Sequence, residues 1–408
     1  MLAKNPDMEA PRTAQLSMST TRIFRLSSFL LGMPFLLATS LSAQLIGSHL
    51  TDLGALPGGS GTAPLDIDSA GKIVGSSITG TAVTRAILYY RGIMTDLGTL
   101  PGGSGSQACG LNQSGQVVGW SNTTGPSGIH AFLLSGGTMT DLGALPGGST
   151  STAMGINTRG TITGYASVAS GGGIDHAVLF TSPIQDLGTL TGGTYSQAFR
   201  INDAGTVVGF STTSGASNPH AFVYSAGAMT DLGTLGGTSS KAYDLNGQGQ
   251  IVGESAIVGG ASHAFLHSGG MMTDLGTLGG TESRANGINS QGVIVGTSDL
   301  AGTTTTHAFV FWKGHMYDLN VIMAGSLSTG SQPGFTSLRF ATRINVDWLV
   351  TGGGDYFDGT THSTRAFSLR LGPTPVLTPG GGAPSYWFMA VLALLGAGRF
   401  FRVRPKRV

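Results

Sequence analysis

The sequence predicts an all-β repeat protein, most specifically a seven-bladed β-propeller. Three observations lead to this fold class. A unit of 43 to 45 residues occurs seven times, each unit contains four strand-like stretches, and the repeat region starts with a lone fourth strand and ends without one. Four strands in each such unit is the blade spacing of a propeller. An open β-solenoid is the alternative, but it would leave the split ends without a purpose.

The units are recognised by a recurring Asp-Leu-Gly motif. Its copies begin at Asp52, Asp96, Asp141, Asp186, Asp231 and Asp274, and Asp318-Leu-Asn is a seventh. In the unit from Asp96 we expect strands over 107–111, 116–121, 130–134 and 139–145. Between the first two, Asn112 starts a turn and Gly115 supplies its positive φ. Each unit is therefore expected to form one four-stranded sheet.

The two ends of the repeat region predict a closed ring. Residues 48–56 read as a fourth strand without its partners, and residues 364–370 read as a third strand with no fourth after it. Pairing the two would complete the last blade and remove an exposed sheet edge. The last unit is irregular, since residues 320–335 are an insertion and Trp348 replaces the turn glycine.

Composition excludes several classes of function. The chain has 408 residues, a net charge of +1 and only 10% charged residues, so it has no basic surface for nucleic acid. Its single cysteine, Cys109, excludes an intramolecular disulfide framework. We expect Cys109 to be a small packed side chain.

The N-terminal region predicts secretion. Arg22 and Arg25 precede a short apolar run over 29–38, and small residues follow up to Ala43. This order is typical of a secretory signal peptide, and the run is too short to span a bilayer. We therefore expect residues 1–43 to be a signal peptide, with Met18 as a possible true start.

The C-terminal region predicts a membrane-associated tail. After the propeller at 44–371, residues 372–385 form a Pro/Gly-rich linker, and residues 386–408 are an apolar segment with a basic end. This order resembles the C-terminal sorting signals of the PEP-CTERM type, which exosortases process, although Pro373-Thr374-Pro375 stands in place of Pro-Glu-Pro. A short transmembrane-like anchor helix is the alternative.

A second motif, His-Ala-Phe, also recurs with the unit. It begins at His130, His220, His263 and His307, and His176-Ala-Val is a variant. With this motif the repeat resembles the HAF family of bacterial extracellular repeats. The resemblance covers residues 45 to about 371 and implies a secreted or cell-surface repeat protein. It implies no catalytic residue.

Two polar positions recur with the unit, and we interpret them as structural. One is the aspartate of Asp-Leu-Gly, and the other is the histidine of His-Ala-Phe, replaced by Arg85 in the first unit and Arg365 in the last. Imidazole and guanidinium groups both donate to carboxylates. We therefore expect one His/Arg–Asp bond per blade, with Arg365 pairing with Asp52 across the ring closure.

Metal binding and catalysis are weaker interpretations of these residues. Histidines placed once per blade would be spread around the ring, and arginine does not ligate metals as histidine does. Calcium is a low-ranking possibility, with Asp66-Ile-Asp68 and the loop of Asp355 and Asp358 as candidates, but neither completes an EF-hand pattern. We expect no other cofactor.

The sequence therefore predicts a non-catalytic protein that binds or builds at the cell surface, as a monomeric propeller. The expected partners are envelope or extracellular polysaccharide or protein, and the membrane through the C-terminal segment. No nucleophile motif such as Gly-x-Ser-x-Gly occurs. The alternative is a secreted propeller enzyme acting on glycans, which two non-repeating carboxylates at the central channel would favour.

Overall fold

The computed structural model describes residues 45–124, 128–169, 174–214, 216–303 and 305–373. The expected signal peptide, apolar segment and basic tail lie outside the described residues. So does the expected linker, except for Gly372 and Pro373, which belong to the last strand of the described chain. Among the described residues, none of the helices has the length and hydrophobicity of a membrane span.

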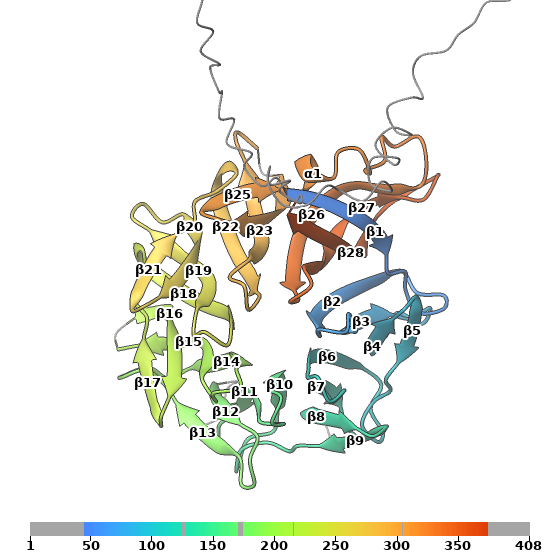
Figure 1. The fold of residues 1–408 in the computed structure, drawn as a ribbon. Coiled ribbons are helices and arrows are strands. Elements are labelled where there is room, and N and C mark those ends of the chain that lie inside the picture. The colour runs from blue at the N-terminus through green and yellow to red at the C-terminus, as the bar shows by residue number, and fades with distance from the viewer. Residues whose placement is uncertain (1–44, 125–127, 170–173, 215, 304, 374–408) are drawn as a thin grey trace, which may run out of the picture. The chain divides into compact units, whose positions relative to one another are not determined.

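The described chain is a seven-bladed β-propeller, as the repeat predicts. Seven antiparallel sheets of four strands follow one another around a central axis (Figure 1). The first strand of each sheet lies nearest the axis and the fourth lies outermost. Each sheet is thus one blade, and the seven innermost strands line the channel.

The blades have the following bounds. Blades 1 and 2 comprise β2 (Gly61–Ile67), β3 (Ile73–Ile78), β4 (Thr84–Tyr90), β5 (Ile93–Asp96), and β6 (Ser106–Leu111), β7 (Val117–Asn122), β8 (Ile129–Ser135), β9 (Thr138–Asp141). Blades 3 and 4 comprise β10 (Ser151–Ile156), β11 (Ile162–Ser167), β12 (Asp175–Leu179), β13 (Gln185–Gly188), and β14 (Ser196–Ile201), β15 (Val207–Thr213), β16 (Ala216–Ser225), β17 (Ala228–Asp231).

Blades 5 and 6 comprise β18 (Gly236–Leu245), β19 (Ile251–Ile257), β20 (Ser262–Ser268), β21 (Met271–Asp274), and β22 (Gly279–Ile288), β23 (Ile294–Leu300), β24 (Thr306–Trp312), β25 (His315–Asp318). Blade 7 comprises β26 (Gly334–Ile344), β27 (Leu349–Phe357), β28 (His362–Pro373) and β1 (Leu45–Asp52).

The ring is closed by strands from opposite ends of the described chain. β1, drawn in blue, lies beside the orange-red β28, and their antiparallel register runs from Leu45 opposite Pro373 to Asp52 opposite Phe367 (Figure 1). This pairing confirms the closure expected from the split ends. It also ties the N-terminal strand into the last blade, so that no blade lacks its outermost strand.

Two details differ from the sequence-based expectation. The fourth strand of the second unit ends at Asp141 instead of residue 145, because the Asp141 carboxylate accepts the N–H of Gly143 and Gly143 turns the chain with φ of +73°. The insertion before β26 contains a four-residue helix, α1 (Leu319–Ile322), which Asp318 caps. Trp348 takes a φ of +59°, so it does occupy the turn position that glycine fills in other blades.

The His-Ala-Phe motif packs one blade against the next. Its alanines, at 131, 221, 264 and 308, are fully buried, and so are the phenylalanines that follow them. Ala86-Ile87, Ala177-Val178 and Ala366-Phe367 fill the same positions in the other blades and are also fully buried. A small residue lets the sheets approach, and the larger one fills the core.

A serine of each innermost strand in blades 2 to 6 joins that strand to the preceding blade. Its hydroxyl accepts the N–H of the motif alanine and donates to the carbonyl of the Asp-Leu-Gly glycine. In blade 4, for example, Ser196 accepts from Ala177 at 2.8 Å and donates to Gly188 at 2.6 Å. The same pair of bonds is made by Ser106, Ser151, Ser240 and Ser283.

The turn asparagines form a second set of bonds between blades, which we call the asparagine ring. In each of six blades the side-chain amide donates to the backbone carbonyl of the equivalent residue in the next blade, at 3.0 to 3.2 Å. The donors are Asn112, Asn157, Asn202, Asn246, Asn289 and Asn345. In blade 1 the equivalent residue is Asp68, whose carboxylate has no N–H group to donate to blade 2.

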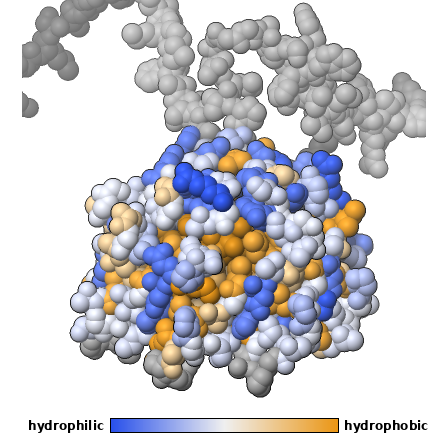
Figure 2. All heavy atoms as spheres, turned by 90° about the horizontal axis from the view of Figure 1, so that it is seen from below, coloured by the Kyte–Doolittle hydropathy of each residue, from blue (hydrophilic) through white to orange (hydrophobic). Residues whose placement is uncertain are grey.

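The outer surface is mixed in polarity. Figure 2 views the ring from below Figure 1, the side on which β9 and β13 lie, and shows hydrophobic residues gathered in the middle of that side with hydrophilic residues around them. The individually exposed large hydrophobic side chains are scattered, from Ile93 in blade 1 to Val321 in α1.

Candidate binding site at the central channel

Each innermost strand carries one residue two positions before the turn residue, and we call this set of seven the channel ring. Its members are Asp66, Gly110, Gly155, Arg200, Asp244, Gly287 and Arg343. At this position the register between the innermost strand and the second strand of the blade shifts in all seven blades. The ring thus brings together two carboxylates and two guanidinium groups, with glycine in the other three blades.

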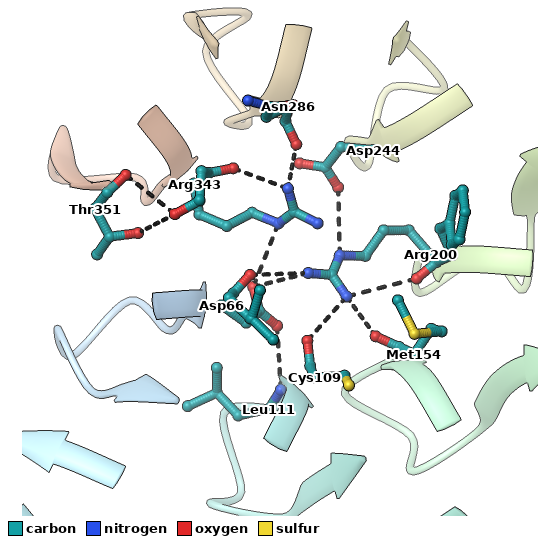
Figure 3. Close-up of polar contacts among 12 residues, drawn as sticks. Asp66, Cys109, Leu111, Met154, Arg200, Asp244, Asn286, Arg343 and Thr351 are labelled. Carbon is teal, nitrogen blue, oxygen red and sulfur yellow. Dashed lines mark hydrogen bonds and ion pairs between the residues drawn. The ribbon is translucent and has the colours of Figure 1, made fainter. Parts of the chain in front are cut away.

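Arg200 is the centre of this group (Figure 3). Its Nη2 lies 3.5 Å from Asp66 Oδ1, and its Nε lies 3.9 Å from Asp244 Oδ1. Nη1 and Nη2 also donate to backbone carbonyls of the innermost strands, including Cys109 and Leu65, each at 3.3 Å. One buried side chain from blade 4 therefore reaches carbonyls of blades 1 and 2 across the channel.

Arg343 enters from blade 7. Its Nη1 donates to the carbonyls of Asn286 and Thr342, and its Nε lies 3.8 Å from Asp66 Oδ1 (Figure 3). Burial and the like charge of Arg200 lower the pKa of Arg343 to about 10. The group still carries its proton at neutral pH.

The two carboxylates are also held by backbone N–H groups. Asp66 Oδ2 accepts from Leu111 at 3.1 Å, and Asp244 accepts from Leu245 and Ile288, each at 3.0 Å. Burial raises the pKa of Asp244, and the two arginines oppose that shift. The four charges sum to zero, so the group forms a neutral, hydrogen-bonded plug in the channel.

A cavity of about 420 Å³ lies on the channel wall beside the plug. It is lined by Leu65, Met154, Phe199, Tyr243, Arg284, Asn286, Phe340, Thr342 and Arg343. Most of these residues immediately precede a channel-ring residue in the sequence. The turn asparagines follow the channel ring, so the cavity lies on the side of the channel ring away from the asparagine ring. A volume of this size is within the range of small-ligand pockets.

An aromatic cluster continues from this cavity toward the loops between the second and third strands. Phe199 lies 5.7 Å from Tyr243 and 5.5 Å from Phe210, and Tyr195 lies 5.8 Å from Phe210, between ring centroids. Lys241 Nζ is 5.1 Å from the centre of the Phe210 ring. The cluster belongs to blades 4 and 5, and Trp120 and Tyr165 occupy the position of Phe210 in blades 2 and 3.

The recurring His/Arg–Asp pairs lie elsewhere, on the outer half of each blade. All seven are within hydrogen-bond distance, from 2.7 to 3.1 Å. They are Arg85–Asp96, His130–Asp141, His176–Asp186, His220–Asp231, His263–Asp274, His307–Asp318 and Arg365–Asp52. The pairs are spread around the ring, one in each blade.

The residues weighed as calcium ligands have other partners. Asp358 accepts hydrogen bonds from the backbone and hydroxyl groups of Thr360 and Thr361, which lowers the pKa of Asp358. Asp355 instead accepts from Ser337 at 2.8 Å. Within the ranges that the structure covers, no three His, Cys, Asp or Glu side chains are grouped to hold a metal.

The acidic residues that do not recur from unit to unit come together only in part. Glu254, Glu282 and Asp299 line a second, smaller cavity of about 200 Å³ in blades 5 and 6. Glu254 accepts the hydroxyl of Tyr243 at 2.6 Å. Cys109 is buried as expected, and burial raises the pKa of its thiol to about 12.

The channel ring and the aromatic cluster were not anticipated from the repeat pattern. Both occupy positions where the units differ from one another. The residue two before the turn asparagine is variously Asp, Gly or Arg, and the residue after the second-strand glycine is Trp120, Tyr165 or Phe210 in three consecutive units. Comparing such variable positions across units was the signal that could have revealed them.

No family model and no curated protein matches this chain. Among solved structures it is similar to TolB from Acinetobacter baumannii, with 12% identity, a TM-score of 0.41, and coverage of 61% of this chain and 63% of that one. It is also similar to a puromycin-hydrolyzing peptidase of Mycobacterium tuberculosis, with 12% identity, a TM-score of 0.48, and coverage of 79% and 56%. A gluconolactonase from Xanthomonas campestris is 9% identical, with a TM-score of 0.35 and coverage of 80% and 95%. The chain thus spans less than two thirds of the first two proteins, and likenesses this distant assign it no activity.

Proposed function

We propose that this protein is a non-catalytic binding module of the cell surface, and that it holds a polysaccharide at the channel end that carries the aromatic cluster. The observation that supports this most is the cavity beside the plug, which opens among Phe199, Tyr243 and their aromatic neighbours. A sugar ring presents an apolar C–H face and a polar hydroxyl edge. Aromatic faces flanked by amide, carboxyl and guanidinium groups match both.

The polar groups beside the aromatic rings suit this role. Gln107 accepts the indole N–H of Trp120 at 3.0 Å, and Gln197 donates to Asp175 at 3.1 Å. Desolvation raises the pKa of Asp175 and raises that of Tyr195 to about 12, so the tyrosine hydroxyl stays protonated as a donor. Such ordered donors and acceptors fix the orientation of a ligand that stacking alone would leave free.

The carboxylates of the channel do not suit general acid–base catalysis. Asp66 and Asp244 both lie within ion-pair distance of Arg200, and each also accepts a backbone N–H. A catalytic acid or base needs a free edge toward its substrate. These two groups are engaged on both oxygens, which favours a structural plug over a reaction centre.

The proposed location at the cell surface rests on the two terminal segments. A signal peptide over 1–43 would export the chain, and the apolar segment with its basic end over 386–408 would hold or sort it at the membrane. The propeller would then meet envelope or matrix polysaccharide outside the cell.

The test is a pull-down with purified full-length protein against isolated cell envelope and secreted polysaccharide, with and without EDTA. We expect saturable binding that Y195A weakens. W120A should weaken it as well, because Trp120 occupies in blade 2 the position that Phe210 has in the cluster. Y90A is the matched control, because Tyr90 is a partly exposed aromatic residue on β4 that does not belong to the cluster. Absence of binding, or an equal reduction of binding by Y90A and W120A, would contradict the proposed site. Binding that is lost only when EDTA is present would favour a calcium-dependent contact.

A glycan-acting enzyme is the second candidate, and one observation favours it: Asp66 and Asp244 meet in the channel around Arg200. Incubating the same polysaccharides with the protein and measuring new reducing ends tests this candidate. Release of reducing ends that D244N abolishes, while W120A only weakens it, would replace the binding proposal.

A further inference from the structure

The cavity beside the plug has a cationic wall. Arg284 and Arg343 both line it, and none of the nine described residues that line it is acidic. Asp66 and Asp244 lie among the plug residues and are already bonded to backbone N–H groups. A ligand in this cavity therefore meets two guanidinium groups on its wall. The nearby carboxylates do not line it: Asp66 lies beside Arg343 in the plug, and Glu254, Glu282 and Asp299 line the neighbouring cavity that Arg284 also borders.

Arg343 also has hydrogen-bonding capacity to spare. Its Nε is buried and, in the part of the chain that the structure describes, has no hydrogen-bond partner. The nearest carboxylate oxygen, Asp66 Oδ1, is 3.8 Å away, which is too far for a hydrogen bond. The guanidinium group of Arg343 also lines the cavity, so an anionic oxygen brought beside it there would be bound favourably.

Arg284 supplies the second guanidinium group of the cavity wall. It lies on β22 with its guanidinium carbon 5.6 Å from the centre of the Tyr243 ring, and its side chain is exposed. Tyr243 itself stacks on Phe199. The same wall thus offers a flat apolar surface and a charged group at its edge.

We infer that this cavity is a subsite for a carboxylate-bearing sugar ring, so that the ligand is an acidic polysaccharide of the uronate class. This inference deepens the proposed function and rests on it. The ring would stack on the Phe199–Tyr243 surface while its carboxylate reaches the guanidinium groups of Arg284 and Arg343. Planar, bidentate recognition of carboxylates is the interaction that arginine makes best.

The experiment compares two probes that differ only in the carboxylate. Oligogalacturonate and the same oligomer with its carboxyl groups reduced to primary alcohols are titrated into the full-length protein by calorimetry. We expect the acidic oligomer to bind about tenfold more tightly or better, since a hydrogen bond to a charged group is worth about that factor. The preference should shrink as salt is raised.

Two arginine variants identify the site. R284Q should reduce the acidic preference by about tenfold while leaving the reduced oligomer unaffected, because it removes one of the two carboxylate donors. R339Q is the matched control: Arg339 lies on β26, contacts Asp355 at 3.6 Å and does not line the cavity. Both variants change the net charge equally, so a general electrostatic effect would appear in both.

The outcomes separate the subsite from the proposed function. Equal affinity for both oligomers, with W120A and Y195A weakening both, would overturn the carboxylate subsite and leave the polysaccharide site standing. Equal loss in R284Q and R339Q would likewise overturn it. Binding of neither oligomer would overturn the uronate assignment, and the envelope pull-down then decides whether any polysaccharide is bound.

Discussion

Replacing Asp68 with asparagine should complete the asparagine ring and stabilise the propeller. Six blades donate a side-chain N–H to the next blade at this position, but Asp68 has only carboxylate oxygens. Asp68 is 4% exposed, its Oδ1 accepts the N–H of Lys72 at 2.8 Å, and its carbonyl already receives the amide of Asn345. Asparagine can keep the bond from Lys72 and add one to the carbonyl of Asn112.

The size of the effect follows from one hydrogen bond. A new buried bond contributes about 1 kcal/mol to the free energy of unfolding. With an unfolding entropy of about 2.1 cal/mol/K per residue over about 330 residues, that corresponds to a rise in Tm of about 1.5 °C. Chemical denaturation should show the same gain as a higher midpoint at an unchanged slope.

The reciprocal variant makes the measurement decisive. N157D places an aspartate at the turn position of blade 3, as blade 1 has naturally. It removes the side-chain bond to the carbonyl of Asn202 and leaves a buried carboxylate facing that carbonyl oxygen. We expect it to lower the free energy of unfolding by about 2 kcal/mol. If D68N is neutral or destabilising while N157D costs nothing, the blades do not depend on this ring and the reasoning fails.

Three further predictions concern the repeat and its core. D186A removes the carboxylate that His176 and the N–H of Gly188 contact, and because the pair is partly exposed it should lower the free energy of unfolding by only about 1 kcal/mol; an unchanged Tm would contradict a structural role. S196A leaves the buried N–H of Ala177 without an acceptor and should cost about 2 kcal/mol, whereas S196T, which keeps the hydroxyl, should cost less. Burial raises the pKa of Cys109 to about 12, so its reactive thiolate is scarce at pH 8; iodoacetamide should modify it only after unfolding in guanidinium chloride, and rapid labelling of the native protein would refute its burial.

The repeat pattern predicted most of the scaffold because its determinants are local. A turn asparagine, a positive-φ glycine and alternating apolar residues act within one unit, and seven copies reinforce the same interpretation. The pairing of Arg365 with Asp52 was also foreseeable, since closure follows from which strand each end lacks. The exact end of the fourth strand was not, because it depends on the Asp141 side chain capping its own turn.

The four-stranded blade, the number of blades and the closure of the ring can therefore all be inferred from the repeat. Which side chains meet at the axis cannot, because it depends on the packing of the blades. Asp66 and Arg200 are 134 residues apart, and each looks like an irregularity of its own unit until the ring brings them within 3.5 Å. The reason is physical: hydrogen bonding within a blade depends on neighbouring residues, whereas convergence at the channel depends on how seven twisted sheets pack around one axis. The candidate site lies where that packing, and not the repeat, brings unlike residues together.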